Sequence, residues 1–263
     1  MSTTSTHGWD PDQYHRFRSE REAAFDDLLA LLHPAPGGRV VDLGCGTGEL
    51  TVRLHDRVGA GETMGVDRSA AMLERARHNA VRGVRFELGD IGAFGDVAAW
   101  DVVAANASLH WVPDHPTALG RWVRGLRPGG QLAVQLPANA DHPSHLVAAE
   151  VAAEFAPAFG GDPPPDPVRN VLAPERYAEL LDALGFADQH VRLQVYGHRL
   201  ASTDDVVEWV KGTGLTRFRA RLDEVAYERF LAAYRARLLA RLGDHRPYFY
   251  AFKRILIWAS SGA

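Results

Sequence analysis

Three aspartates in the first third of the chain each follow a short apolar run. Asp42 stands in "VVDLGCGTGEL", Asp67 ends "TMGVD", and Asp90 ends "FELGD". Directly after Asp42, glycines recur at alternate positions from Gly44, which lets a ligand approach the backbone closely. Carboxylates accept hydrogen bonds and pair with cations. This pattern predicts recognition of a ligand that donates hydrogen bonds and has a cationic end.

Other ligands of glycine-rich turns fit the sequence poorly. A P-loop requires a lysine after its last glycine, and none follows here. The dinucleotide fingerprint requires the spacing G-x-G-x-x-G, whereas this turn has G-x-G-x-G, and Asp42 would repel a pyrophosphate. Asp67 suits the two hydroxyls of a ribose. Asp90 suits an adenine amine, with Ile91 against the ring, so we expect a nucleoside with an amino-acid end and no binding of nicotinamide.

The elements that position these aspartates alternate between strand and helix. Short apolar runs predict strands, and apolar spacings of three and four predict helices. The expected strands span 39–43, 63–67, 84–90, 101–108 and 131–137, and the expected helices span 19–33, 49–57, 70–80 and a segment that begins near Asp114. Ser69 should cap the third helix, and "RPGG" should turn the chain before 131. This alternation predicts a mostly parallel sheet with helices on both faces.

The pattern changes after Pro137. The stretch "PAFGGDPPPDP" predicts an extended segment rather than core. Further expected elements are a helix at 174–184 with Pro174 in its first turn, a sixth strand at 188–198 that alternates through Val191, Leu193 and Val195, helices within 203–241 and a last strand at 252–260. These elements complete a seven-stranded sheet and insert a helical cap, which we expect over the carboxyl ends of the strands.

Composition narrows the function classes. The chain has 263 residues, a formal net charge of −4 and a 46% hydrophobic content, so we expect a small-molecule ligand and neither a nucleic acid nor a membrane partner. Cys45 is the single cysteine, which fits the cytoplasm, and we interpret it as a packing residue. The pairs His110 with His115 and His142 with His145 lack a third ligand, so we expect no metal. We expect a monomer or a homodimer.

The motifs "VVDLGCGTGEL", "GVDRSAAMLERAR", "FELGDI", "ANASLHW" and "LRPGGQLAV" together resemble the class I S-adenosylmethionine-dependent methyltransferases. The resemblance implies an α/β fold of the Rossmann-like class I methyltransferase type, in which a mostly parallel seven-stranded sheet carries helices on both faces and a helical cap. It implies S-adenosyl-L-methionine as the cofactor and S-adenosyl-L-homocysteine as the product. The cofactor-binding residues implied are Tyr14, Asp42, Gly44, Gly46, Asp67, Arg68, Met72, Asp90, Ile91, Asn106 and Leu109.

Further segments resemble one family within that class. "WDPDQY", "NASLHWVPDH", "LAVQLP", "WVKGTGL" and the closing "FKR" are similar to trans-aconitate methyltransferases along nearly the whole chain. The family esterifies a carboxylate of a small tricarboxylic acid. We therefore expect an N-terminal arm and helix at 1–33 that close over the cofactor, a cofactor-binding α/β core at 34–137, and a segment 138–263 that completes the sheet and forms the acceptor pocket.

The acceptor is the part that the sequence defines least. A carboxylate with a pKa near 4 is already an ionised nucleophile at neutral pH, so methyl transfer to it requires no general base. The residues we expect at the acceptor are Trp9, Tyr14, His110, Trp111, Arg169, Tyr196, Lys211 and Arg217. One alternative is a methyltransferase of the same fold that acts on a hydroxyl, nitrogen or carbon with His110 as base. A more remote alternative is a non-catalytic protein that binds S-adenosylmethionine.

Overall fold

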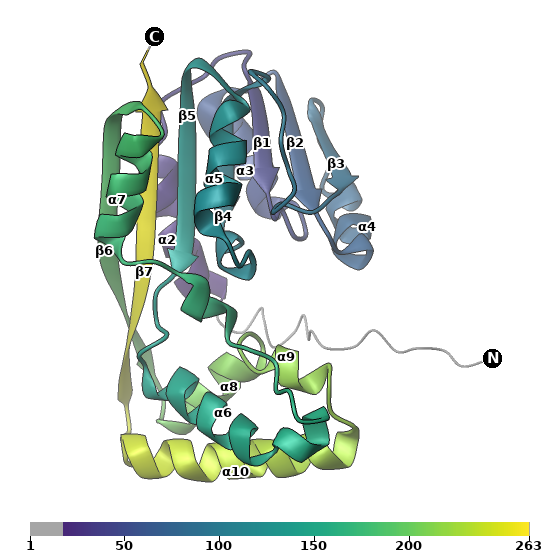
Figure 1. The fold of residues 1–263 in the computed structure, drawn as a ribbon, viewed down its shortest axis with the longest axis vertical. Helices are drawn as coiled ribbons and strands as arrows, with labels where there is room; N and C mark the ends of the chain where they lie inside the picture. Colours follow the sequence, from purple (N-terminus) through teal and green to yellow (C-terminus); the bar gives the residue numbers. More distant parts are fainter. Residues whose placement is uncertain (1–17, 263) are drawn as a thin grey trace, which may run out of the picture. The chain divides into compact units, whose positions relative to one another are not determined.

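The computed structural model describes residues 18–262 (Figure 1). Its strands are β1 (Arg39–Leu43), β2 (Glu62–Asp67), β3 (Val84–Leu88), β4 (Trp100–Asn106), β5 (Leu126–Pro137), β6 (Phe186–Leu200) and β7 (Tyr248–Ser261). Its α-helices are α2 (Arg18–Leu31), α3 (Glu49–Val58), α4 (Ala70–His78), α5 (His115–Arg124), α6 (Pro143–Glu154), α7 (Pro174–Ala183), α8 (Asp204–Lys211), α9 (Thr216–Arg219) and α10 (Glu224–Leu242). Three 3₁₀ turns are η1 (Leu109–Trp111), η2 (Ala156–Phe159) and η3 (Pro167–Asn170).

The strands form one seven-stranded sheet in the order β3-β2-β1-β4-β5-β7-β6. Strands β1 to β5 pair in parallel, and β7 pairs with β5 in the antiparallel direction. The chain builds outward from β1 to β3 on one side and then from β4 to β5 on the other. The order therefore reverses between β1 and β4, and the carboxyl ends of these two strands flank the usual ligand crevice of an open α/β sheet.

The chain divides into two compact units. In the part described beyond Arg21, unit 1 comprises 139–166 and 196–252, and unit 2 comprises 22–138, 167–195 and 253–262. Strands β6 and β7 contribute residues to both. Each unit has its own apolar cluster, so each is described by itself below.

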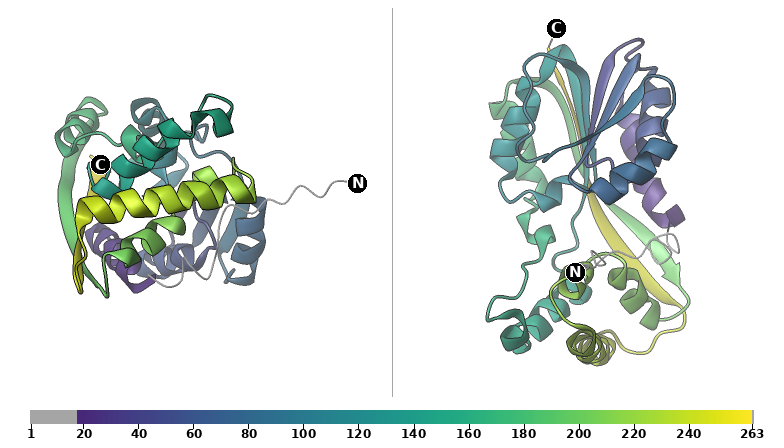
Figure 2. Two further views of the ribbon diagram at one scale, coloured as in Figure 1. Left: turned by 90° about the horizontal axis from the view of Figure 1, so that it is seen from below. Right: turned by 90° about the vertical axis from the view of Figure 1, so that its right-hand side faces the viewer.

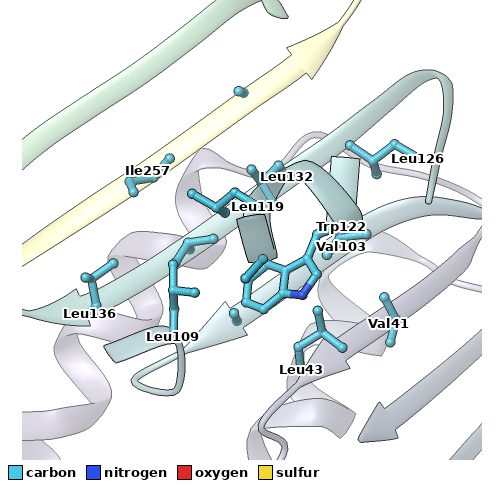
Figure 3. Packing of buried hydrophobic residues seen from close by; sticks show 14 of the residues in the cluster. Val41, Leu43, Val103, Leu109, Leu119, Trp122, Leu126, Leu132, Leu136 and Ile257 are labelled. Atoms are coloured by element: carbon cyan, nitrogen blue, oxygen red, sulfur yellow. The ribbon is translucent and has the colours of Figure 1, made fainter. Parts of the chain in front are cut away.

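Unit 2 packs helices against both faces of the sheet, as the alternation of elements predicts. Helices α5 and α7 cover one face, and α2 and α3 cover the other (Figure 2, right). Trp122 of α5 lies at the centre of the first layer, among Leu43, Val103 and Leu119 (Figure 3). Its indole is fully buried and donates a hydrogen bond to the carbonyl of Ile91 at 2.9 Å. The packing of α5 thus holds the loop after β3 in place.

Unit 1 is built mainly from α6, α8 and α10 around an aromatic cluster. Phe218, Phe230 and Tyr234 are fully buried within it. Exposed ion pairs join α10 to α6, one between Arg237 and Glu154. The expected Arg-rich helices within 203–241 are therefore α8, α9 and α10, whose apolar sides bury a core.

Several local predictions are confirmed by the structure. The Ser69 side chain accepts from the Met72 N–H at 3.3 Å and caps α4. Helix α5 begins directly after Asp114, near which its start was expected, and the structure adds that the Asp114 side chain caps it by accepting from the Thr117 N–H at 3.1 Å. Pro174 occupies the first turn of α7, as expected. Caps depend on a few adjacent residues, so they can be recognised from sequence.

Three expectations were wrong or incomplete. The "RPGG" segment at 127–130 is a bulge within β5 rather than a turn before it, because the register with β4 shifts between Trp100 and Val102. Helix α6 occupies 143–154, where no helix was expected. Finally, β6 exists, but Leu193 and Val195 are 48% and 52% exposed. Strand β6 lies at an edge of the sheet, so alternation alone does not identify a buried face.

We expect Trp122→Leu to lower the free energy of unfolding by about 3 kcal/mol, because it leaves a cavity and removes the donor to Ile91. Urea denaturation followed by circular dichroism measures this loss. The matched control is Trp111→Leu. Trp111 is 42% exposed, so the loss there should stay under about 1 kcal/mol. Equal losses for the two variants would contradict the assigned core.

Candidate active site

The glycine turn after β1 has a left-handed backbone at each of its three glycines. A Cβ on Gly44 would lie 2.2 Å from the Ser108 Cβ, so the backbones after β1 and β4 approach too closely for any side chain. A Cβ on Gly46, where φ is +55°, would meet nothing within 4 Å. Gly44 therefore serves the packing of the strand ends, whereas Gly46 faces open space that a ligand can use.

Asp67 is tied to the glycine turn. Its Oδ2 accepts from the Gly46 N–H at 2.9 Å, and its Oδ1 accepts from the Ser69 N–H at 2.9 Å. Both carboxylate oxygens therefore have fixed positions at the end of β2. Each oxygen still has a free lone pair, as acceptance from two ribose hydroxyls requires.

Asp42 is buried at the end of β1. Its Oδ2 accepts from the Thr51 hydroxyl of α3 at 2.6 Å. Burial raises the pKa of Asp42 to about 6, with a smaller raising effect from the charge of Asp67, although the Thr51 hydrogen bond opposes the shift. A nearby cation would favour the ionised form.

Cys45 lies in the same turn and is buried. Burial, together with the charges of Asp42 and Asp67, raises its pKa far above the usual range for a thiol. Cys45 therefore stays protonated at neutral pH, which agrees with a packing residue rather than a nucleophile.

The expected adenine-binding residues lie beyond β2 and β3. Asp90 is exposed, and its Oδ1 accepts from the Gly92 N–H at 2.9 Å. Ile91 and Met72 are half-buried. Asp90 and Ile91 follow β3, and Met72 lies on α4, which follows the neighbouring strand β2. Contact with the edge and the faces of an adenine requires such a carboxylate and such apolar side chains.

The carboxyl end of β4 leads into η1. Asn106 ends the strand, and its enclosed Oδ1 has no hydrogen-bond partner among residues 18–262. Leu109 is fully buried in the apolar cluster of unit 2, so its side chain belongs to the core and only its backbone could face a ligand. The expected contact between Leu109 and the cofactor is therefore one that its main chain would make.

His110 and Trp111 follow on η1. His110 is 7% exposed, and its carbonyl accepts from the Asn170 side chain at 3.0 Å. Trp111 is largely exposed, and the Arg68 guanidinium lies 5.7 Å from the centre of its ring. Arg68 follows β2 and Trp111 follows β4, so this pair bridges the two strands that flank β1.

The remaining expected acceptor residues are distributed over both units. Arg169 is exposed on η3 of unit 2. In unit 1, the Lys211 ammonium lies 3.5 Å from a Glu208 carboxylate oxygen, and the guanidinium of the half-buried Arg217 lies 3.6 Å from a carboxylate oxygen of Asp166. Tyr196 is half-buried and begins the unit 1 part of β6. Trp9 and Tyr14 lie outside the described residues.

Two buried polar residues, Asp166 and Gln135, were not expected from the sequence. In unit 1, the buried Asp166 carboxylate lies 2.7 Å from the Nδ1 of His145 and also pairs with Arg217. In unit 2, Gln135 lies within β5 and is 1% exposed. The glutamine inside the apolar run "LAVQLP" could have indicated a polar group in the core. No pattern in the sequence indicates that His145 contacts Asp166.

The residues at the ends of β1, β2 and β4 fit S-adenosylmethionine. Gly46 leaves room for a ligand against the backbone, Asp42 supplies a carboxylate for a cationic end, and the enclosed Asn106 Oδ1 lacks a donor. Asp67 is positioned for ribose hydroxyls. These features lie at one edge of the sheet in unit 2. Their order across β2, β1 and β4 is a ribose acceptor, a carboxylate for the cationic end and a carboxamide.

Comparison with known proteins supports this interpretation. Residues 34–161 match the family model described as a methyltransferase domain. The chain is 44% identical to trans-aconitate 2-methyltransferase of Deinococcus radiodurans, covering 96% of this chain and 98% of that protein. It is 38% identical to the protein of that name from Acidovorax ebreus, covering 96% and 98%. The fold matches Haemonchus contortus phosphoethanolamine N-methyltransferase 2 with bound S-adenosylhomocysteine, with a TM-score of 0.56 and 17% identity over 92% of this chain and 53% of that one.

The fold and the site together define an S-adenosylmethionine-dependent methyltransferase of class I, as the sequence predicted. Within that class, the chain belongs to the trans-aconitate 2-methyltransferase family. In the described part of the chain, no helix is long and apolar enough to span a membrane.

We expect Gly46→Ala and Gly44→Ala to fail for different reasons. Gly46→Ala should weaken S-adenosylmethionine binding at least about tenfold while costing about 1 kcal/mol of stability, because its methyl group enters the open space. Gly44→Ala should cost about 3 kcal/mol of stability through its clash with Ser108. Calorimetric titration and thermal unfolding measure the two quantities. A stable Gly46→Ala protein with unchanged affinity would contradict the ligand site.

We expect Asp42 to make stability depend on pH. The folded pKa is raised from 3.8 to about 6, so the group's contribution is fully present below pH 4 and is lost as pH rises through 6. The loss is roughly 3 kcal/mol for two pKa units. Asp42→Asn should therefore reduce the difference in unfolding free energy between pH 5 and pH 8.

Ligand binding provides the second readout for Asp42. A cationic group beside the carboxylate should tighten S-adenosylmethionine binding as pH rises through 6, with proton release that calorimetry in two buffers detects. Asp42→Asn is the control and should bind without this proton release. Wild-type affinity that is constant from pH 5 to pH 7.5 would argue against a cation at Asp42.

Proposed function

We propose that this enzyme transfers a methyl group from S-adenosylmethionine to a carboxylate oxygen of trans-aconitate or a closely similar small acid. The observation that carries this proposal is 44% identity to a trans-aconitate 2-methyltransferase over 98% of that protein's length. The similarity continues through the segments after 137, where an acceptor pocket is expected. The products are a methyl ester and S-adenosylhomocysteine.

The chemistry demands alignment rather than acid–base catalysis. The cofactor, when bound, supplies an electrophilic methyl group on a sulfonium. Asp42, Asp67 and Asn106 orient the cofactor from three neighbouring strand ends. A carboxylate acceptor is ionised at neutral pH, so no residue has to remove a proton. Holding the acceptor oxygen in line with the methyl group can lower the barrier by roughly 7–11 kcal/mol.

The proposed organisation assigns these tasks to parts of the chain. We infer that 1–33 closes over the cofactor, that 34–137 binds it, and that 138–263 completes the sheet and forms the acceptor pocket. Arginines and Lys211 would hold the remaining carboxylates, because guanidinium and ammonium groups pair with them strongly. A small-molecule acceptor in the cytoplasm and a monomer or homodimer belong to the same proposal.

His110 distinguishes the main proposal from its nearest alternative. The buried ring at the end of β4 is also a suitable position for a base acting on a hydroxyl, nitrogen or carbon acceptor. With a carboxylate acceptor, His110 contributes only shape and orientation.

We expect trans-aconitate to be methylated and His110→Ala to retain kcat within about tenfold, because the acceptor carries no proton to remove. Mass spectrometry of the methyl ester and the rate of S-adenosylhomocysteine formation measure both effects. A loss of roughly 10²–10⁴ in kcat would indicate a general base and favour the alternative. Absence of turnover with trans-aconitate would remove that acceptor and leave the enzyme class standing.

A further inference from the structure

Two glutamines lie on the same face of β5, and within residues 18–262 the side-chain oxygen of only one of them accepts a hydrogen bond. Gln131 accepts from the His33 N–H at 2.8 Å and from the Trp258 indole at 3.0 Å, and it donates to the His33 carbonyl at 3.1 Å. Gln135 is only 1% exposed, yet its enclosed Oε1 has no hydrogen-bond partner among residues 18–262. Because a buried polar group without a partner destabilises a fold, packing does not explain a glutamine at 135.

A second carboxamide whose oxygen lacks a partner in the described chain lies beside Gln135. Asn106 of β4 lies directly opposite Gln135 in the parallel register, and its Oδ1 is also enclosed without a partner in the described chain. Side chains alternate between the faces of a strand, and Ala104 and Ala133 pack on the face covered by α2 and α3. Asn106 and Gln135, two residues further along their strands, therefore face the same side.

Asp42 belongs to the same row. Val40, two residues before it on β1, packs on the α2 and α3 face, and the Asp42 carboxylate accepts from Thr51 of α3. The carboxyl ends of β1, β4 and β5 thus present a carboxylate and two carboxamides, in that order, on one side of the sheet.

The order of the strands separates the tasks of these three groups. The glycine turn follows β1, and β4 is the neighbour of β1, so Asp42 and Asn106 flank the cofactor position. Strand β5 lies beyond β4, which places it roughly 10 Å from β1 at the usual strand spacing. Gln135 therefore lies on the far side of Asn106 from the turn, so we assign it to the acceptor rather than to the cofactor.

The chemistry of a carboxamide suits an acid. It carries two N–H donors and one carbonyl acceptor, and rotation about its last torsion exchanges them. It is neutral, so it avoids the large desolvation cost of a buried ion, and it forms strong charge-assisted hydrogen bonds with a carboxylate. We propose that Gln135 is a recognition residue that binds a carboxylate of the methyl acceptor. This inference rests on the proposed function, namely that the acceptor is a carboxylic acid.

The first test compares Gln135→Leu with the matched variant Gln131→Leu. Gln135→Leu should raise KM for trans-aconitate roughly 10- to 100-fold and leave the calorimetric Kd for S-adenosylmethionine within about twofold, because one hydrogen bond to a charged group is lost. Its Tm should not fall, since the enclosed Oε1 of the wild-type amide has no partner to lose among residues 18–262. Gln131→Leu should lower the Tm and leave both constants near wild type, because its partners are His33 and Trp258.

The second test varies the charge and the acceptor. Gln135→Glu should impair trans-aconitate turnover more than Gln135→Leu does, because the introduced carboxylate repels the carboxylate of the bound acid. Mesaconate and cis-glutaconate each lack a different carboxyl group of trans-aconitate and keep the geometry of the rest. With one of these two acids, Gln135→Leu should change kcat/KM less than about threefold, because that acid lacks the carboxylate that Gln135 binds.

The outcomes separate this inference from the proposed function. If the wild type methylates none of the three acids, the proposed function fails and the assignment of Gln135 falls with it. If the wild type is active but Gln135→Leu keeps its KM and loses Tm, Gln135 is structural and only this inference is overturned. A changed Kd for S-adenosylmethionine with an unchanged KM for the acid would assign Gln135 to the cofactor and overturn it as well.

Discussion

The parallel pairing of β1 with β2 on one side and with β4 on the other is the constraint on which the site depends. Parallel strands end at the same edge of the sheet, so residues far apart in the sequence meet there. The close approach of Gly44 to Ser108 and the hydrogen bond from Gly46 to Asp67 both follow from this pairing. The buried helices on the two faces hold the strand ends in register.

The same edge concentrates groups that destabilise the folded protein. Burial raises the pKa of Asp42, and the carboxamides of Asn106 and Gln135 contain enclosed oxygens without partners in the described chain. Elsewhere in the sheet, Gln131 shows how a buried amide is satisfied when its role is structural. Unsatisfied polar groups at a ligand edge are typical of sites that obtain their partners from the ligand.

The distribution of successful and failed predictions has a physical pattern. The cap of α4, the start of α5 near Asp114 and the strands around the glycine turn were predicted from sequence, because each depends on residues that are adjacent in the chain. The bulge within β5 and the exposed side chains Leu193 and Val195 of β6 were not, because both depend on which strand lies alongside. Helix α6 was missed in a stretch of small apolar residues without a clear polar face.

The sequence by itself determined the cofactor half of this protein. The G-x-G-x-G spacing and the aspartates at three strand ends are local features, and their chemistry follows from residue type and order. Only the tertiary structure decided that Leu109 belongs to the core, that Asp166 lies between His145 and Arg217, and that Gln135 lies opposite Asn106. These facts depend on strand register and on packing between distant segments, which no single stretch of sequence contains.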